Sequence, residues 1–379
     1  MKKVALFFGG RSTENEISVL TGVFVLNLLD REKYIPFPVY IHTDGLLYTS
    51  SECFRVEAFK KRDFSSFKRV IIEGGKAYLF RPEKSKLKPL GKIDVAINCC
   101  HGGWGEGGGV SALMERNGVP IASPELTESG VFLDKALTKL LAKALNIPVV
   151  EYIRFNEADY AKRGKFLLKN IAARLKYPVV VKPARGGSSI GITLAKDEDE
   201  VKEGIEAAFE LDKKLVVERY VQGKLDVNCA AYSLGGEIFV SEPEIAARGG
   251  IYTFSDKYLR SDEDGVRAKD GGRVEANEKL SSTLREKIRA ATRTVYRRTG
   301  LKGIVRMDFL VSGEEYYLGE VNTVPGSLAY YLFCERISEA KSLFGALIED
   351  AILEKPKRTP TTGVLQAAKL SSKRGDVRL

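Results

Sequence analysis

The chain has few of the residues that build disulfide scaffolds and transition-metal sites. Its 379 residues include five cysteines, two histidines and one tryptophan. The cysteine number is odd, the spacing is irregular, and no CxxC pair occurs among Cys53, Cys99, Cys100, Cys229 and Cys334. This pattern argues against a zinc site or a disulfide framework and favours buried, reduced thiols in a cytosolic protein.

Long apolar runs are also missing. The start, MKKVALFF, resembles that of a signal peptide, but the polar stretch GGRSTENE follows at once and leaves the apolar region too short. No segment approaches the ~18 apolar residues of a membrane helix. We therefore expect a cytoplasmic protein that does not bind membranes. The turn after the first strand reads GGRS rather than GxGxxG, so the dinucleotide-binding fingerprint is absent there. The phosphate-binding pattern GxxxxGK[ST] does not occur, and no internal repeat is visible.

Positive charge is in excess, since 60 Lys and Arg face 50 Asp and Glu and give a net charge of +10. Such a balance suits nucleic acid, anionic membranes or anionic small molecules such as ATP. The basic residues are spread along the chain, with denser stretches near 162–176 and at the C-terminal end. Dispersed surface charge is therefore favoured over a nucleic-acid footprint. The length is typical of two or three domains.

Short apolar strands alternate with Gly-rich turns and helices, which predicts an α/β fold. Strands are expected at KKVALFF, FPVYIH and IDVAINCC, and a helix over 12–30 would begin with a capping box of Thr13 and Glu16. YPVVVKP and ITLAK should form a hairpin with a Gly/Ser tip, and IVRMDFLV and EYYLGEVN a second hairpin around SGEE. A helix over 276–300 should end at Gly300.

Two polar side chains stand at the end of the last of these strands. Glu320 and Asn322 are two residues apart, so they point to the same face of a strand. The tight SGEE turn would bring Asp308 of the preceding strand beside them. Oxygen ligands of this kind select hard cations, and one or two Mg2+ or Mn2+ ions could hold a triphosphate there. Taken alone, the same residues could form a solvated hairpin end.

Two further clusters suggest nucleotide binding. Lys182 closes an apolar strand and is followed by a Gly/Ser loop at 186–191, whose backbone N–H groups could wrap phosphate oxygens. Glu218, in LVVERYV, could accept a hydrogen bond from a base amine. Each has a simpler alternative, a flexible hairpin tip and an exposed strand-end glutamate respectively.

The order of five segments makes the chain resemble the D-alanine–D-alanine ligases of the ATP-grasp superfamily. The segments are GGRSTENEIS (9–18), HGGWGEGGG (101–109), SGVFLDKALTK (129–139), VKPARGGSSIG (181–191) and EVNTVPG (320–326). The resemblance extends to about residue 350. It implies an α/β (α+β) chain with a three-domain ATP-grasp fold. The expected parts are a Rossmann-like substrate-binding domain (1–122), a central ATP-grasp subdomain with the phosphate loop (123–219), a C-terminal ATP-grasp subdomain with the metal site (220–354) and a basic tail (355–379).

The resemblance also implies a role for individual residues. Those expected to bind ATP are Lys135, Lys182, Lys257 and Ser189 at the phosphates, Glu218, Arg219, Tyr220 and Val221 at adenine, and Asp226 at the ribose. The expected ligands of two Mg2+ ions are Asp308, Glu320 and Asn322. At the amino-acid site, Glu14 would hold the amino group of the first substrate and His101 would lie beside its carboxylate. Ser188 and Tyr258 would link to Glu14, and Arg306 with the backbone N–H of Gly326 would stabilise the oxyanion.

Three positions depart from the family pattern. The usual GEDG reads GEGG here, with Glu106 but no aspartate after it. Leu225 stands where a ribose-binding glutamate is expected, so either Asp226, one step later, shifts to the ribose or the ribose is held differently. SLAYYLF replaces MTxxS, so that Tyr331 stands where a serine binds the second substrate and Ser327 comes earlier. The resemblance therefore implies intact nucleotide residues and an altered acceptor pocket.

The function implied is ATP-dependent synthesis of D-alanyl-D-alanine through an acyl phosphate, for peptidoglycan precursors, by a protein expected to be a homodimer. A related ligase with D-serine, D-lactate or another acceptor is an alternative, as is a nucleotide-binding protein without turnover. A nucleic-acid-binding protein, suggested by the charge alone, is the fourth hypothesis.

Overall fold

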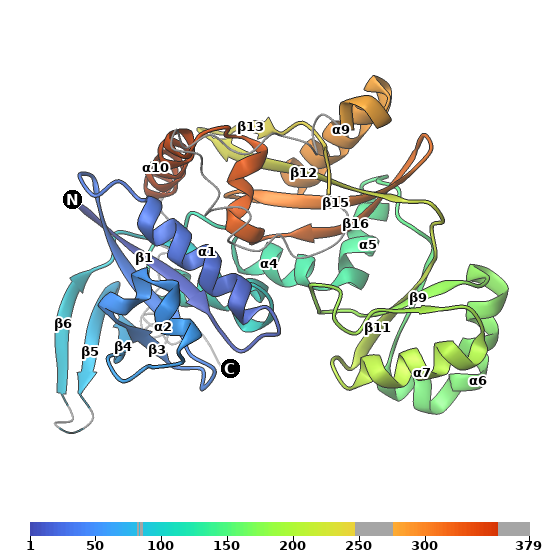
Figure 1. Cartoon of the computed structure of the whole chain (residues 1–379), viewed down its shortest axis with the longest axis horizontal. Helices are drawn as coiled ribbons and strands as arrows, with labels where there is room; N and C mark the ends of the chain where they lie inside the picture. The colour runs from blue at the N-terminus through green and yellow to red at the C-terminus, as the bar shows by residue number, and fades with distance from the viewer. Residues whose placement is uncertain (82, 84–85, 247–275, 355–379) are drawn as a thin grey trace, which may run out of the picture.

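The computed structural model describes residues 1–81, 83, 86–246 and 276–354, which form three β-sheets covered by helices (Figure 1). The first sheet has seven strands in the order β6-β5-β4-β3-β2-β1-β7. Their bounds are β1 Lys2–Gly9, β2 Tyr34–Ile41, β3 Leu47–Thr49, β4 Lys68–Glu73, β5 Lys76–Arg81, β6 Lys86–Lys92 and β7 Val95–Asn98. β1 is parallel to both β2 and β7, whereas the other neighbours are antiparallel. β1 is buried from Val4 to Gly9, as its unbroken apolar run predicts.

Helix α1 (Asn15–Leu28) makes the crossover that the parallel pair β1–β2 requires. The expected capping box of Thr13 and Glu16 is wrong, because the helix begins at Asn15 and the N-cap residue, Glu14, makes no side-chain cap. The Ser12 hydroxyl accepts the Glu14 N–H at 3.1 Å instead. The Glu14 carboxylate therefore projects from the end of the helix without capping it.

Short helical segments complete this part of the chain. They are η1 (Ser51–Phe54), α2 (Val56–Lys60), the π-helical turn η3 (Gly105–Gly109) and α3 (Val110–Arg116). Two helices then lead to the second sheet, α4 (Leu126–Leu133) and α5 (Lys135–Ala144). Asp134 caps α5, accepting the N–H groups of Ala136 and Leu137.

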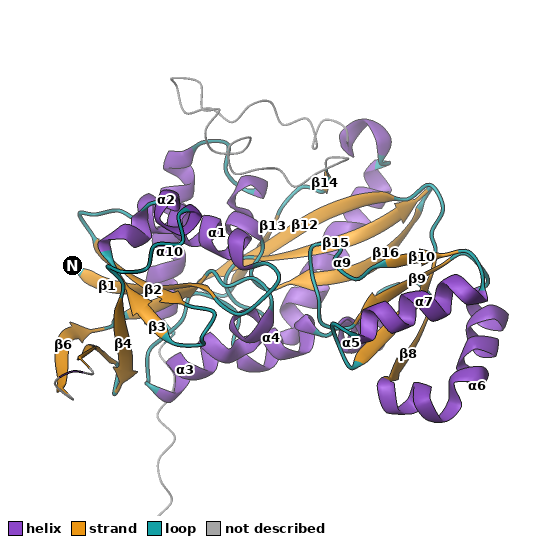
Figure 2. Ribbon diagram, turned by 60° about the horizontal axis from the view of Figure 1, so that its bottom comes forward, coloured by secondary structure: helices purple, strands orange, loops and turns teal. Residues whose placement is uncertain are grey.

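The second sheet is antiparallel, in the order β10-β9-β11-β8. It is made of β8 Tyr152–Asn156, β9 Val179–Pro183, β10 Thr193–Ala195 and β11 Lys214–Arg219, and it carries α6 (Glu157–Leu175) and α7 (Glu198–Phe209). Figure 2 shows both helices against one face of this sheet, where Ile171 and Ile205 are fully buried. β9 and β10 form the hairpin expected around the Gly/Ser tip.

The third sheet is also antiparallel and runs β13-β12-β15-β16, with β14 paired to β12. The bounds are β12 Leu225–Leu234, β13 Glu237–Val240, β14 Glu244–Ile245, β15 Val305–Ser312 and β16 Glu315–Asn322. Helix α9 (Ser282–Thr299) packs on it through Ile288 and Val295 and ends at Gly300, which adopts the left-handed conformation expected for a C-cap (φ 72°).

The chain then returns to the first sheet. A short helical turn, η5 (Gly326–Leu332), and α10 (Ile337–Leu353) share a core with α1 and β1 that includes Phe8, Leu328 and Phe344. Tyr34 of β2 donates to Glu349 of α10 at 2.9 Å. The strand-end segment after β16 is thereby fixed against the N-terminal part of the chain.

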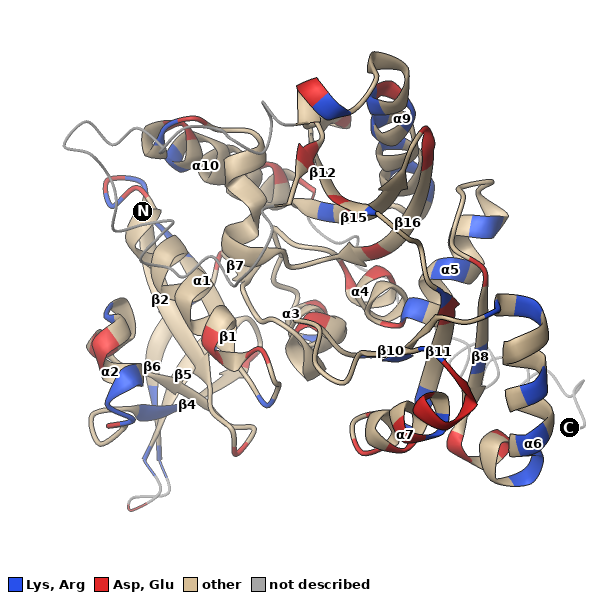
Figure 3. Cartoon of the chain, turned by 45° about the vertical axis from the view of Figure 1, so that its right-hand side comes forward, with Lys and Arg blue, Asp and Glu red and all other residues tan. Residues whose placement is uncertain are grey.

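The structure bears in different degrees on the predicted domain boundaries, the basic tail, the dispersed charge and the absence of membrane helices. The domain boundaries at 122/123, 219/220 and 354/355 stay a prediction, and the basic tail lies outside the described residues. Lys and Arg are distributed over many elements, including α6 and α9 (Figure 3). Among the helices that the structure describes, none combines the length and apolar character needed to cross a membrane.

Candidate active site

The hairpin of β15 and β16 brings four polar side chains to one face. Asp308 lies directly opposite Glu320, and Arg306 directly opposite Asn322, with a bulge after Asp308. Arg306 donates twice to Asp308, from Nε at 2.7 Å and from Nη2 at 2.8 Å, and the Asn322 amide donates to the same carboxylate at 2.9 Å. The predicted juxtaposition of Asp308, Glu320 and Asn322 is therefore present, with Arg306 added to it.

Glycine at position 319 suits the bulge. A Cβ at Gly319 would lie 3.0 Å from the backbone oxygen of Asp308, which is tighter than most Cβ contacts, so a larger residue would require a small shift of one strand. The extra residue is Gly319 of β16, so Leu318 and Val321 are both buried although they are three residues apart, and Glu320 remains opposite Asp308. A bulge re-aims the side chains next to it, which is a common device beside functional sites.

The electrostatics of the two carboxylates differ. Burial raises the pKa of Asp308, against the opposing effect of Arg306, and the neighbouring Glu320 adds to the rise. Burial would also raise the pKa of Glu320, but Lys135, Lys182 and Arg306 outweigh it and the pKa is lowered. Glu320 is thus held ionised by cations from three different strands and helices.

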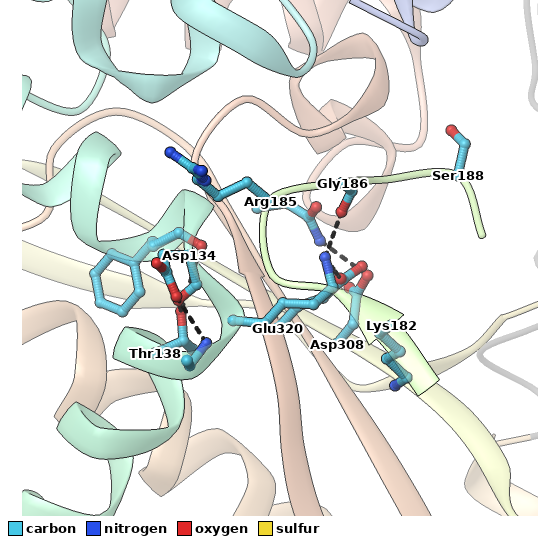
Figure 4. A network of polar contacts seen from close by, with 12 residues as sticks. Asp134, Thr138, Lys182, Arg185, Gly186, Ser188, Asp308 and Glu320 are labelled. Carbon is cyan, nitrogen blue, oxygen red and sulfur yellow. Dashed lines mark hydrogen bonds and ion pairs between the residues drawn. The ribbon is translucent and has the colours of Figure 1, made fainter. Parts of the chain in front are cut away.

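Two predicted phosphate lysines lie next to this face. Lys135, the first residue of α5, has its ammonium 3.3 Å from Glu320 and donates to the backbone oxygen of Gly186. Lys182 of β9 donates to Glu218 at 2.8 Å. Figure 4 shows Lys182, Asp308 and Glu320 gathered beneath Gly186 of the Gly/Ser loop.

The Gly/Ser loop closes over the site from the second sheet. Arg185 anchors its base, with two guanidinium donors on Asp212 at 2.6 and 3.2 Å. Ser188 and Ser189 both have left-handed backbone conformations, with φ of 50° and 59°. The Ser188 hydroxyl donates to Glu14 at 2.6 Å, which is the link expected from the sequence.

Gly187 leaves room for this contact. A Cβ on Gly187 would lie 2.3–2.5 Å from the Glu14 carboxylate, so the carboxylate would have to shift from its present position. The loop of the second sheet and the first turn of α1 are therefore in direct contact, although 174 positions separate Ser188 from Glu14.

His101 and Glu106 lie buried on the N-terminal side. Burial, with a contribution from Arg306, lowers the pKa of His101 to about 3, so the imidazole is neutral at pH 7. Its Nε2 is 3.0 Å from the Thr21 hydroxyl, which also accepts the Ser327 N–H at 3.1 Å. Glu106 accepts the Gly102 N–H at 2.6 Å, and burial raises its pKa to about 7.

The segment after Gly326 has an unusual backbone. Ser327, Leu328 and Ala329 adopt left-handed conformations in succession, with φ of 53°, 52° and 47°. Such conformations cost roughly 1–2 kcal/mol per non-glycine residue. The turn places Ser327 against Thr21 and directs Tyr331 to the site, where its hydroxyl accepts from Arg306 Nη1 at 3.3 Å.

Glu218 is fully enclosed, so the alternative of an exposed strand-end glutamate is wrong. Arg219, Tyr220 and Val221 follow it at the end of β11. The Arg219 N–H donates to Glu151 and the Tyr220 N–H to Pro178, so both of these donors are already used. Asp226 has an exposed side chain that pairs with Lys224, and its charge also helps to raise the pKa of Lys182. Lys257 and Tyr258 lie outside the described residues.

Sequence reasoning missed one residue of this cluster. Lys139 is completely buried, and its ammonium lies 2.9 Å from Glu218. It comes four residues after Lys135, so both side chains leave the same face of α5. This four-residue spacing is the sequence feature from which the position of Lys139 beside Lys135 could have been predicted.

The arrangement suits oxygen-binding cations and phosphates. Two half-buried carboxylates and a side-chain amide form the donor set that Mg2+ prefers, and the amide of Asn322 keeps its oxygen available because it donates through nitrogen. No group of three or more His, Cys, Asp or Glu side chains placed to hold a metal occurs among the described residues. Any metal here would therefore depend on the Asn322 amide or on ligands supplied by the substrate.

Comparison with known proteins assigns this arrangement to a class. Two family models match, "D-ala D-ala ligase N-terminus" over residues 3–124 and "D-ala D-ala ligase C-terminus" over 141–353. Similar proteins include the D-alanine--D-alanine ligase of Thermosipho africanus, 32% identical over 88% of each chain, and that of Clostridium acetobutylicum, 31% identical over 93% of this chain and 97% of the relative.

Solved structures agree. The D-alanine–D-alanine ligase from Helicobacter pylori has a TM-score of 0.74 at 25% identity and covers 94% of this chain and 100% of its own. The VanG D-Ala:D-Ser ligase from Enterococcus faecalis has a TM-score of 0.70 at 24% identity, covering 94% and 99%. The chain thus has the ATP-grasp fold and is an ATP-dependent ligase. It belongs to the D-alanine–D-alanine ligase family.

Proposed function

We propose that the chain joins two molecules of D-alanine at the expense of ATP, as the names of its relatives indicate, to supply a peptidoglycan precursor. The observation that carries the proposal is the 2.6 Å hydrogen bond from Ser188 to Glu14. It joins the candidate phosphate loop to the candidate amino-acid site, beside the face that holds Arg306 and Asp308. A ligase of this kind needs those two sites in contact.

The chemistry follows from the difficulty of forming an amide from a carboxylate. A carboxylate oxygen of the first substrate attacks the γ-phosphorus of ATP, and ADP leaves with the electrons of the broken bond. The amine of the second substrate then attacks the acyl carbon, loses a proton, and inorganic phosphate departs with one oxygen of the original carboxylate. Lys135 and Lys182 would neutralise the transferring phosphoryl group, and Arg306 would face the oxyanion.

The residues proposed to bind the first amino acid have properties that suit this role. Glu14 is positioned by Ser188 to accept an ammonium group, and the neutral His101 lies beside Thr21. A water-free site is needed, because water would hydrolyse the acyl phosphate. The loop over the site, with Ser188 and Ser189, would contribute to that exclusion.

Mg2+ fits the proposal through Asp308, Glu320 and Asn322, and two ions or Mn2+ are compatible with the same donors. When bound, it would supply positive charge at the phosphates. For Asp308 to serve as a ligand, one of the hydrogen bonds from Arg306 or Asn322 must give way. The homodimer and the cytoplasmic location stay predictions.

The segment around Tyr331 favours an alternative function, in which the acceptor is a molecule other than D-alanine. Tyr331 stands where the family pattern has a serine, and a left-handed turn that begins at Ser327 precedes it. One experiment separates D-alanine from the other acceptors. Mg-ATP and D-alanine are incubated alone or with an equal concentration of D-serine or D-lactate, and the products are identified by mass spectrometry. D-alanyl-D-alanine as the main product in every mixture supports the proposal, whereas a mixed product that outcompetes it assigns a different acceptor. ADP formation without any ligated product supports neither acceptor. No ADP formation in any mixture favours a nucleotide-binding role without turnover.

A further inference from the structure

Lys139 is the most deeply buried charged side chain near the candidate nucleotide site. Its side chain is 0% exposed, and its ammonium lies 2.9 Å from Glu218 Oε1 and 5.7 Å from the centre of the Tyr152 ring. The ammonium forms an ion pair without a well-aligned hydrogen bond to any residue that the structure describes. A buried lysine is costly unless its charge has a use, so the position calls for an explanation.

Glu218 receives two cations, one on each oxygen. Lys139 faces Oε1, and Lys182 donates to Oε2 at 2.8 Å. Burial would raise the pKa of Glu218, but Lys139 and Lys182 outweigh it and bring the pKa to about 2. Burial lowers the pKa of Lys139, against the opposing effect of Glu218. The charged forms of Glu218 and Lys139 therefore stabilise each other.

The two lysines differ in what else they can reach. Lys182 is partly exposed at the open side of β9, in the position proposed for a phosphate contact, whereas Lys139 is enclosed by α5, β8 and β11. If Lys182 turns to a phosphate when ATP binds, the Oε2 atom of Glu218 becomes available to another donor. Without Lys139, the buried carboxylate would then lose its last cation.

We propose that Lys139 is a positioning residue for base recognition: it holds the Glu218 carboxylate in place while Lys182 moves from Glu218 to phosphate, so that Glu218 can accept the exocyclic amine of adenine. This inference rests on the proposed use of ATP. It goes beyond the predicted role of Glu218, because it assigns a function to a side chain that is too enclosed to contact the nucleotide phosphates.

The experiment compares ATP with purine riboside triphosphate, which lacks the amine. Affinities are measured by calorimetry without amino acid, so that no turnover is required. A hydrogen bond to a charged group corresponds to a preference for ATP of about 10- to 100-fold. Lys139→Met should remove most of that preference, weakening ATP by about 10-fold or more and purine riboside triphosphate by less than about 3-fold.

The matched control is Lys143→Met. Lys143 is one turn further along α5 and lies over the same Tyr152 ring at 4.9 Å, but its side chain is exposed rather than buried beside Glu218. This variant should bind both nucleotides like the wild type. Equal weakening of both nucleotides in Lys139→Met, or no weakening of either, would overturn the proposal.

A second variant keeps the test valid if Lys139→Met does not fold. Glu218→Gln with Lys139→Met removes both members of the pair and leaves no unpaired charge of either. If Lys139 acts through Glu218, adding Lys139→Met to Glu218→Gln should change the ATP affinity by less than about 2-fold. A further 10-fold loss would show that Lys139 acts independently of Glu218. Wild-type binding of ATP without any dipeptide product would contradict the proposed function and leave this test unaffected.

Discussion

Glu320→Gln separates the role of the hairpin in catalysis from its role in the fold. Glu320 lies opposite Asp308 and 3.3 Å from Lys135. Like charges opposite each other on antiparallel strands cost about 0.2–1 kcal/mol. The ion pair with Lys135 contributes about 0–1 kcal/mol, discounted because the Glu320 side chain is 36% exposed. These effects oppose each other, so the free energy of unfolding should change by less than about 1 kcal/mol and the melting temperature by no more than about 4 °C.

Activity should respond very differently. Removing a charge that stabilises the transition state typically lowers the rate by about 100- to 1,000-fold, and Glu320 is also a proposed metal ligand. The assay measures ADP release with Mg-ATP and D-alanine, alongside thermal unfolding with and without Mg-ATP. The variant should lose the activity and most of the additional stabilisation by Mg-ATP, while the free protein melts normally. Glu315→Gln is the matched control, because Glu315 lies on the same strand but is exposed, and its carboxylate accepts the Tyr317 hydroxyl at 2.6 Å. Activity within 10-fold of the wild type in Glu320→Gln would refute the assignment.

Three further results are expected. Burial raises the pKa of Glu106 to about 7 from an ordinary value of 4.5. Between these two pH values the folded state binds more protons than the unfolded state, so stability falls as the pH rises from 4.5 to about 7. Glu106→Gln should raise the free energy of unfolding at pH 8 by up to about 3 kcal/mol and have little effect at pH 4, as read from denaturant titrations; an equal gain at both values would contradict the shift. Ser188→Ala should lower kcat/KM by about 10- to 100-fold with less than ~1 kcal/mol change in stability, because it removes the exposed hydroxyl that donates to Glu14. Unchanged kinetics would show that this bond is dispensable. All five cysteines are buried, and burial raises the pKa of Cys53 to about 12. An aromatic disulfide reagent should react with none of them rapidly at pH 8 and with all of them after denaturation; a fast native reaction would contradict this burial.

The parts of the site that the sequence predicts correctly depend on short-range geometry. A two-residue spacing and a tight turn are enough to place Glu320 and Asn322 beside Asp308, and the structure confirms this juxtaposition. The hairpin with the Gly/Ser tip and the helix end at Gly300 also follow from local turn chemistry.

The parts that it does not predict depend on long-range contacts or on backbone strain. The partner of Lys139 comes from a strand 79 positions away, so periodicity marks its helix face but not its burial or its ion pair. The left-handed turn at Ser327 contradicts the local preference of non-glycine residues and is held by Thr21 of α1. The capping box at Thr13 was replaced by the Ser12 hydroxyl, which is an equally good local acceptor.

The most direct test of the proposed chemistry follows the oxygen atoms. D-alanine labelled with 18O in both carboxylate oxygens is incubated with the protein and Mg-ATP, and the dipeptide and phosphate are analysed by mass spectrometry. We expect D-alanyl-D-alanine together with one 18O in each phosphate released, because the acyl phosphate passes one carboxylate oxygen to phosphorus. Phosphate without the label, or ADP release without dipeptide, would contradict the account.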